Sequence, residues 1–393
     1  MPTIKLQHYS IVSALGLGKQ AQLGALQQQQ SGLTPCDYPE ATINSYIGKV
    51  TGLEYAFAPE ALKEYQCRNQ QIVQLALETD GFIGAVNQAK SRYGTSRIAT
   101  LIGTTSSGLE EVEKAYRASH NGLWPQDFNY RRTSYNGATS EFISRYLGLT
   151  GLHYTIGNAC TSSLSVFNQA ARLIRAGIVD AAVVGGVESL CLTTLQGFNS
   201  LELLSPEPCR PCDQHRNGLN IGEGAGFILL EKASIATGDI ILASSGESSD
   251  AHHISTPSAD AIGAVYSMQQ ALKQAKLQTQ DIGYINSHGT ASLVNDKAED
   301  QAICQLFGNK TPYSSTKGWT GHTLGAAGAI ETIFTALALE QQTLWGTLNL
   351  QEQDKAIQGN VIKENTQASL NHALVHSIGF GGNNSSLILS RVR

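Results

Sequence analysis

Charged side chains are scarce in this chain. Asp, Glu, Lys and Arg make up 15% of its 393 residues, against about 25% in an average soluble protein. The net charge is −5 and no run of Lys or Arg exceeds two residues, so we expect no surface that binds nucleic acid or an anionic membrane. With so little charge to place in water, the chain should bury a large interior and a substantial subunit interface.

Long apolar runs are also missing. No uninterrupted apolar stretch approaches the roughly 20 residues that a membrane-spanning helix needs, and the first residues lack the apolar core of a secretory signal. The seven cysteines form an odd, scattered set, which argues against a disulfide framework and for a reducing compartment. The sequence therefore predicts a cytoplasmic protein without a membrane span, in which a reactive thiol can persist.

Short apolar runs alternate with longer helical stretches. Residues 98–103 and 181–186 have the composition of strands, and a helix is expected near 107–119. Strands that are apolar throughout are typical of a sheet covered by helices on both faces. The pattern predicts an α/β fold. Because 393 residues exceed the usual size of one core, we expect two core-forming units that meet near residues 231–239.

One cysteine lies at the start of a predicted helix. Cys160 is followed by apolar residues at helical spacing as far as residue 176, with Gly177 as a stop signal. The unpaired N–H groups and the positive dipole of a helix start stabilise a thiolate, so we expect a nucleophile at neutral pH. A single cysteine is more often a small buried apolar residue than a catalyst, so this hypothesis needs partners.

Two histidines of the second half supply those partners. His288 follows the strand-like run 282–285, and His322 opens a second helical stretch, 322–331, which is rich in small residues. Functional groups of α/β folds commonly lie in the loops where strands end. A helix N-terminus beside His322 would lower its pKa and keep a neutral imidazole that donates from Nε2. The three residues together predict nucleophilic catalysis, which none of them predicts alone.

Four separate sequence blocks resemble a known family. In this order and spacing, they make the chain similar to the β-ketoacyl-[acyl-carrier-protein] synthases of the thiolase superfamily, the decarboxylating type with one Cys and two His. The resemblance implies a thiolase-like, duplicated, five-layered α-β-α-β-α fold, with an N-terminal half at 1–235 and a C-terminal half at 236–393. The blocks are Asn-Ala-Cys-Thr-Ser-Ser at 158–163, Ser-His-Gly-Thr at 287–290 with Asn295, Asp296 and Glu299, Ser-Thr-Lys at 315–317 with Gly-His at 321–322 and Gly-Ala-Ala-Gly at 325–328, and Gly-Phe-Gly-Gly-Asn-Asn at 379–384.

The resemblance also implies a role for each matched residue. Cys160 would accept the acyl chain, and His288 and His322 would promote decarboxylation of a malonyl thioester and stabilise the enolate. Phe380 would gate the site and contribute its amide to the oxyanion site. The other matches are Lys317 and Glu331, as an active-site ion pair, and Thr290 and Ser292, as contacts of the pantetheine arm. No metal and no resident cofactor are implied, because the phosphopantetheine belongs to the partner acyl carrier protein.

Two positions depart from the family pattern. Cys209 and Cys212 form a Cys-x-x-Cys segment where the family usually has an aromatic residue before Asp213. A zinc site would need a second pair of ligands, and His215 is the only obvious helper. Ile378 stands where an aromatic residue often precedes the gating segment, so the resemblance does not set the width of the pocket there.

Finer expectations also come from the resemblance. The blocks at 197–202 and 246–253 are similar to ketosynthases of aryl-polyene pathways, which implies an aryl or polyenoyl thioester as the acyl substrate. The partner would be an identical subunit or a ketosynthase-like chain-length factor, giving a homodimer or a heterodimer. The carrier protein of this family is acidic, so basic residues should dock it. Candidates by rough position are Arg68, Arg131, Arg132 and Arg210.

Two alternatives stay open. A non-catalytic chain-length factor has the same fold but lacks the nucleophile, which Cys160 supplies here. A thiolase condenses CoA esters without decarboxylation and needs a second, C-terminal cysteine. No cysteine follows Cys304, and Phe380 stands in the corresponding segment.

Overall fold

One mixed sheet organises the computed structural model, which describes residues 3–393. Two groups of five strands make up most of it, and they are joined where Lys5 pairs with Ile241. The N-terminal group is β1 (Ile4–Ser13), β5 (Ile98–Gly103), β6 (His153–Ile156), β7 (Ala181–Glu188) and β9 (Gly224–Lys232). The C-terminal group is β10 (Ile240–Ser249), β11 (Tyr284–Asn286), β12 (Pro312–Ser314), β16 (His372–Gly379) and β17 (Asn383–Arg391).

The two groups repeat one topology. Their strand orders are β1-β9-β7-β5-β6 and β10-β17-β16-β11-β12, which is 1-5-4-2-3 when the strands of each group are numbered along the chain. In both groups the first two pairings are antiparallel and the last two are parallel. The duplication that the resemblance implied is therefore present in the topology, although residue identity between the halves is slight.

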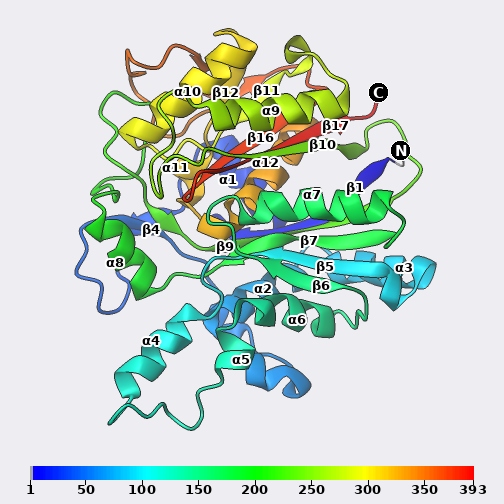
Figure 1. The fold of residues 1–393 in the computed structure, drawn as a ribbon, viewed down its shortest axis with the longest axis vertical. Coiled ribbons are helices and arrows are strands. Elements are labelled where there is room, and N and C mark those ends of the chain that lie inside the picture. Colours follow the sequence, from blue (N-terminus) through cyan, green and yellow to red (C-terminus); the bar gives the residue numbers. More distant parts are fainter. Residues whose placement is uncertain (1–2) are drawn as a thin grey trace.

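Helices form three layers around and between the strands (Figure 1). In the middle, α7 (Ser162–Arg175) contacts β5 and β7, and α12 (Ala327–Gln341) contacts β16 and β9. Together with the strands, these layers give the five-layered thiolase-like arrangement that was expected. The outer layers are α2 (Arg68–Glu78), α3 (Phe82–Tyr93) and α6 (Asn136–Tyr146) on the N-terminal half, and α9 (Ile262–Ala275) and α10 (Leu293–Phe307) on the C-terminal half.

Close packing of the two middle helices depends on glycine. A Cβ at position 328 would lie 2.4 Å from Cγ of Leu164, whereas carbon atoms pack at about 3.5–4.0 Å. Around this contact Phe167, Ile330 and Ile333 belong to one buried apolar cluster. The Gly-Ala-Ala-Gly block therefore brings the two halves of the molecule together.

Most predicted elements are present, with one displaced boundary. Residues 98–103 form β5, and α4 (Leu109–Ala118) covers the predicted helix near 107–119. The helix after Cys160 is α7, and Gly177 has a φ of 69° beyond its end. The second helix begins later than predicted, at Ala327, so His322 lies in a loop. No helix within residues 3–393 has the length and apolar character needed to cross a membrane.

The predicted junction between the two halves, at 235/236, lies in the segment between β9 and β10. That segment connects the last strand of the first topological repeat to the first strand of the second. Whether each half is a folding unit with these bounds stays a prediction.

Candidate active site

The turn between β6 and α7 presents Cys160. Ala159 has a φ of 46°, a left-handed conformation that costs a residue with a Cβ roughly 1–2 kcal/mol. Two hydroxyls hold the turn in place: Thr161 Oγ1 donates to the carbonyl of Asn158, and Ser162 Oγ donates to the carbonyl of Ala159. Strain that the surroundings enforce in this way is characteristic of functional sites.

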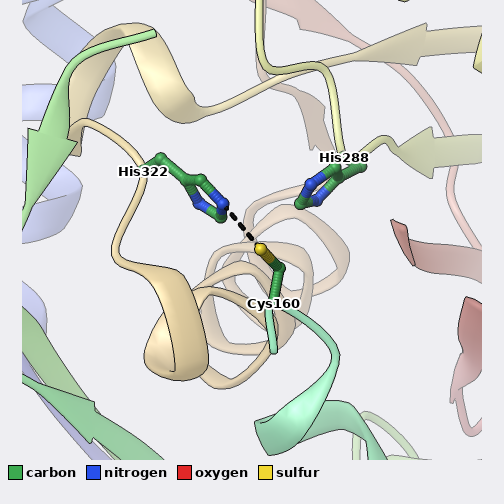
Figure 2. A group of neighbouring side chains, drawn as sticks. All are labelled: Cys160, His288 and His322. Carbon is green, nitrogen blue, oxygen red and sulfur yellow. Dashed lines mark hydrogen bonds between the residues drawn. The ribbon is translucent and has the colours of Figure 1, made fainter. Parts of the chain in front are cut away.

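His288 and His322 converge on Cys160 from the C-terminal half (Figure 2). His288 follows β11, and His322 follows the short helix α11 (Lys317–Thr320). Nε2 of His322 lies 3.1 Å from Sγ of Cys160, and the two imidazole rings are 5.1 Å apart, edge to face. The sulfur and one nitrogen of each ring lie within 4.8 Å of one another. The structure thus brings together the three side chains that the sequence assigned to one site.

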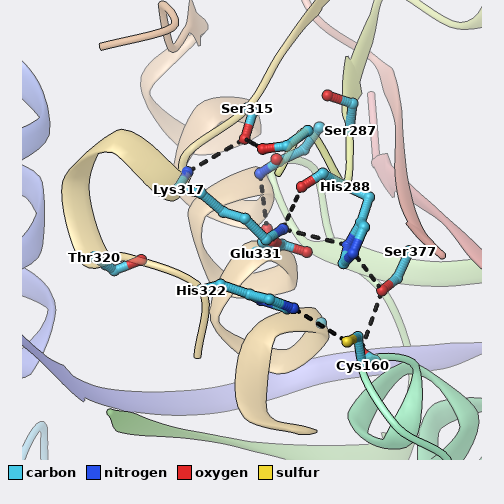
Figure 3. Close-up of polar contacts among 12 residues, drawn as sticks. Cys160, Ser287, His288, Ser315, Lys317, Thr320, His322, Glu331 and Ser377 are labelled. Atoms are coloured by element: carbon cyan, nitrogen blue, oxygen red, sulfur yellow. Dashed lines mark hydrogen bonds and ion pairs between the residues drawn. The ribbon is translucent and has the colours of Figure 1, made fainter. Parts of the chain in front are cut away.

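Lys317 fixes the protonation of the His288 ring (Figure 3). Its Nζ lies 3.3 Å from Nδ1 of His288 and 2.5 Å from Oε1 of Glu331, and it also donates to the carbonyl oxygen of His288. A lysine ammonium has three protons and no acceptor, so all its protons are engaged and Nδ1 must accept. The proton of the neutral His288 ring therefore lies on Nε2.

Both histidines are neutral at physiological pH. Burial, followed by the positive charge of Lys317, lowers the pKa of His288 and of His322 well below 6.5. For His322 the direction of the pKa shift agrees with the sequence-based expectation, but its leading cause is burial. Because α12 begins only at Ala327, the ring does not sit at the first turn of that helix.

Cys160 is a thiol and not a thiolate at rest. Burial raises its pKa to about 11, although the charge of Lys317 and the backbone N–H of Phe380 act in the opposite direction. The thiolate stabilisation expected from a helix start is therefore not found, because burial shifts the pKa of Cys160 in the opposite direction. A neutral His322 at 3.1 Å from Sγ is in position to accept the proton when the sulfur attacks.

The second acidic group of the site is Glu331. Burial raises its pKa to about 7, against the lowering effect of Lys317. Lys317 and Glu331 lie in contact with 2% and 3% of their side chains exposed. A buried ion pair of this kind holds its geometry firmly, because removing either partner leaves an uncompensated charge.

Cys160 lies where two cavities meet. A cavity of about 370 Å³ carries both histidines, with Thr290 and Ser292 further along its wall. A second cavity, of about 430 Å³, is predominantly apolar and is formed largely by α8 (Leu192–Ser200) and its neighbours. Phe380 lines both cavities, and its ring stacks on that of Phe198 at 5.7 Å. Ile378 lies on the wall of the first cavity.

The four candidate docking arginines are all engaged with carboxylates. Arg68 binds buried Glu223 through two nitrogens, so it is a structural ion pair and not a free docking group. None of the four lines either cavity. The remaining pairs are Arg131 and Arg132 with Glu141, and Arg210 with Glu207.

The two cysteines of the Cys-x-x-Cys segment have structural roles in the protein interior. Cys209 and Cys212 are buried, and Cys209 Sγ donates to the carbonyl of Lys317. Burial raises the pKa of both thiols, which disfavours metal binding or redox exchange. Within residues 3–393, the one group of three or more His, Cys, Asp or Glu close enough to share a metal ion is the Cys160 group.

A metal in the Cys160 group would face two electrostatic obstacles. The Lys317 ammonium contacts the ring of His288 and would repel a cation. A metal-binding cysteine must lose its proton, and burial raises the pKa of Cys160 to about 11. These charges favour an acyl-transfer site over a metal site.

Sequence reasoning missed several buried polar residues around the site. Ser377 Oγ lies 3.3 Å from Nδ1 of His288 and donates to the carbonyl of Cys160. Glu188 accepts from the N–H groups of residues 105, 106 and 325, which ties the loop after β5 to the start of the segment that leads into α12. A signal was available for Glu188, which ends the otherwise apolar strand β7, because a buried polar group requires a partner.

Two family models match the sequence. They are the Beta-ketoacyl synthase N-terminal domain, over residues 49–236, and the Beta-ketoacyl synthase C-terminal domain, over residues 240–351. The 3-oxoacyl-[acyl-carrier-protein] synthase 2 of Vibrio harveyi is 30% identical over 416 residues, covering 97% of each chain. The enzyme of the same name from Rhizobium meliloti is 38% identical over 315 residues, covering 74% of this chain and 73% of the other.

Solved structures agree with these matches. The ketosynthase ApeO of Xenorhabdus doucetiae, in complex with its chain length factor ApeC, superposes with a TM-score of 0.91 and 34% identity, covering 100% of this chain and 98% of the other. Fold and site together define an acyl transferase with a thiolase-like fold. Within that class, the chain belongs to the beta-ketoacyl synthase family.

Proposed function

We propose that this protein is a β-ketoacyl-[acyl-carrier-protein] synthase that condenses an acyl thioester with malonyl-carrier to give 3-oxoacyl-carrier and CO₂. The observation that carries the proposal is the meeting of Cys160 Sγ with two neutral imidazoles within 4.8 Å. Relatives named 3-oxoacyl-[acyl-carrier-protein] synthase, matched over 97% of this chain, support it.

The first half-reaction loads Cys160. As the thiol attacks the acyl thioester, Nε2 of His322 takes its proton, and the N–H of Phe380, already directed at the sulfur, stabilises the oxyanion. A sulfur–carbon bond forms to Cys160 and the one to the carrier breaks. The proton then passes from His322 to the departing carrier thiolate. A thioester suits this purpose, because sulfur is both a good nucleophile and a good leaving group.

The second half-reaction uses the histidines as donors. Nε2–H groups of His288 and His322 donate to the malonyl thioester carbonyl while the bond to the carboxylate breaks and CO₂ leaves. The electron pair remains as an enolate, whose carbon attacks the acyl carbonyl on Cys160 and expels the sulfur as a thiolate. The thiolate takes up one proton from solvent and returns to the resting thiol. Nδ1 of His322 has no partner within residues 3–393, so this ring is free to hold its proton on Nε2 here and to accept at Nε2 in the first half-reaction.

The two cavities suit the two parts of the substrates. Thr290 and Ser292 line the cavity that contains both histidines, and we assign them contacts with the pantetheine arm of the carrier. The predominantly apolar cavity beyond Phe380 would take the acyl chain. The resemblance of the blocks at 197–202 and 246–253 to aryl-polyene ketosynthases points to an aryl or polyenoyl chain. The protein itself would need no metal and no resident cofactor.

The partner would be a second chain of the same fold, either an identical subunit or a chain-length factor. ApeO is in complex with its chain length factor. Here β6 ends the sheet with one edge unpaired by any described strand, and an open edge favours pairing with another chain. Large apolar side chains are also exposed on α4 and in the residues that follow it: Tyr116, Leu123, Trp124 and Tyr130. Seven free cysteines suit a reducing, cytoplasmic location.

Purified protein supplied with acyl-carrier and malonyl-carrier tests the proposal. The expected products are 3-oxoacyl-carrier and CO₂, and mass spectrometry should find the acyl group on Cys160. Cys160→Ala should abolish condensation, whereas Cys36→Ala, far along the chain from the site, should not. Condensation by the Cys160→Ala variant would show the assignment to be wrong. Decarboxylation without acylation of the wild type would favour a chain-length factor, and condensation of acetyl-CoA alone would favour a thiolase.

A further inference from the structure

A third buried histidine lies behind the proposed catalytic pair. His376 is in β16 and is 0% exposed, with Nδ1 2.9 Å from Oε1 of Glu299. Its Nε2 is buried without a hydrogen-bond partner within residues 3–393. An unpaired buried nitrogen is costly, and an apolar side chain would avoid that cost. The proposed reaction does not use this histidine, so its presence requires another explanation.

Glu299 connects His376 to the backbone of the site. Its carboxylate accepts the N–H of His288 at 2.6 Å and the N–H of Gly289 at 2.7 Å. Because an ionised carboxylate can only accept, Nδ1 of His376 carries the proton that it shares with Glu299. The carboxylate is thus held by an imidazole on one side while it holds the main chain of His288 on the other.

Adjacent residues of β16 therefore reach His288 by two routes. Successive side chains of a strand point to opposite faces. Ser377 contacts the His288 ring at Nδ1 from one face, at 3.3 Å. His376, on the other face, acts through Glu299 on the His288 backbone. The ring is held at Nδ1 by Lys317 and lies against Ser377, and the position of the residue is fixed by Glu299.

We propose that His376 is a positioning residue for His288, acting through Glu299 in the decarboxylation step. This inference rests on the proposed function. Without the imidazole N–H, the carboxylate is free to turn away from the His288 and Gly289 amides, and Nε2 of His288 moves relative to the malonyl carbonyl. A displacement of about 1 Å costs on the order of 10²-fold in rate. Acylation of Cys160 does not require His288, so it should be spared.

Two amide variants separate positioning from packing. In His376→Asn the amide nitrogen can occupy the place of Nδ1, whereas in His376→Gln it extends toward the place of Nε2. Both variants put an amide into the same buried space, so they are matched for polarity. The rate of Cys160 acylation, followed by intact mass, and the rate of malonyl-carrier decarboxylation are measured separately, together with thermal unfolding.

The expected result is a split between the half-reactions. His376→Gln should lower decarboxylation by about 10- to 100-fold while Cys160 acylation stays within about twofold of the wild type. His376→Asn should retain most of both rates. Equal losses in both half-reactions, or equal behaviour of Asn and Gln, would overturn the positioning role. A wild-type protein that does not condense would instead overturn the proposed function.

Discussion

Nζ of Lys317 lies 3.3 Å from Nδ1 of His288, and this contact joins the buried ion pair to the proposed catalytic ring. Because the ammonium only donates, it selects the neutral tautomer with the proton on Nε2. The same ammonium contacts Glu331 and lowers the pKa of both histidines. One lysine thus sets the tautomer and the charge of the site.

Replacing Lys317 by Met should therefore impair decarboxylation more than acylation. We expect a loss of about 10²-fold or more in malonyl-carrier decarboxylation, because no ammonium then donates to Nδ1 of His288 to keep the ring proton on Nε2. The unfolding free energy should fall by about 1–3 kcal/mol, since Glu331 loses the ammonium that offsets its burial and is left as a buried polar group without a partner. The double variant Lys317→Met with Glu331→Gln should recover stability, measured by urea unfolding, but not the rate. Recovery of both would mean that Lys317 acts only as a counter-charge.

At low pH, the rate of decarboxylation should follow the protonation of Glu331. The pKa of Glu331 is raised to about 7. Above pH 7 Glu331 is therefore a carboxylate that holds Lys317. Below pH 7 Glu331 is protonated and no longer holds the ammonium. Decarboxylation should decline as the pH falls through about 7. His288 and His322, with pKa values well below 6.5, stay neutral in this range and add no inflection. Glu331→Gln should give a lower, flat profile between about pH 6 and 8; an unchanged inflection would assign it to another group.

Local sequence was sufficient for the elements that carry the site. Residues 98–103 are apolar apart from Thr100 and form β5, and residues 181–186 are apolar and form most of β7. Cys160, His288 and His322 stood out because each lies in a loop of small residues beside a strand or helix. The start of α12 was misplaced because Leu324 has a φ of 48°, and a leucine gives no sequence signal for a left-handed turn.

Properties that depend on contacts made only in the folded chain could not be predicted from the sequence. The charge state of Cys160 depends on how completely the two halves bury it, and that burial reverses the shift expected from a helix start. His376 and Glu299 are 77 positions apart, so their pairing exists only in the folded chain. The sequence suggested that Arg68 is an exposed charge, but in the structure it forms an ion pair with buried Glu223.

The raised pKa of Cys160 predicts slow alkylation by iodoacetamide in the resting protein. With a pKa of about 11, the thiolate fraction, and with it the rate, should rise about tenfold per pH unit between about pH 7 and 9. Mass spectrometry of the Cys160 peptide gives this rate directly, with Cys36 as a partly exposed internal reference. A rate that is already constant at neutral pH would indicate a resting thiolate and contradict this description.

Glycine at position 328 should be required for packing between the halves. Gly328→Ala places a Cβ 2.4 Å from Leu164, and overpacking of this kind costs about 1–3 kcal/mol of unfolding free energy. Gly84→Ala is the matched control, because Gly84 lies within α3 and nothing lies within 4 Å of its Cβ position. There, alanine should stabilise the helix by about 0.5–1 kcal/mol. Equal unfolding midpoints for the two variants would contradict the packing argument.

The exposed aromatic residues after α4 should form part of the subunit interface. Figure 1 shows α4 extending away from the layered body of the molecule, and the Trp124 ring stacks on Phe128 at 5.4 Å with 51% of Trp124 exposed. Aromatic residues of this kind commonly dominate the binding energy of an interface, at about 2 kcal/mol or more each. Because both chains of a homodimer carry the change, Trp124→Glu should weaken dimerisation by about 10³-fold.

Sedimentation of the purified protein measures that effect. The wild type should sediment as a dimer of chains of this fold, and Trp124→Glu should shift toward the monomer mass of 42.0 kDa. Tyr266→Glu is the control, because Tyr266 is 52% exposed but lies on α9, in the outer layer of the other half. If both variants keep the wild-type mass, the α4 segment is not the interface. A wild type that sediments as a monomer would rule out the homodimer and leave a distinct partner chain as the subunit that covers the edge of β6.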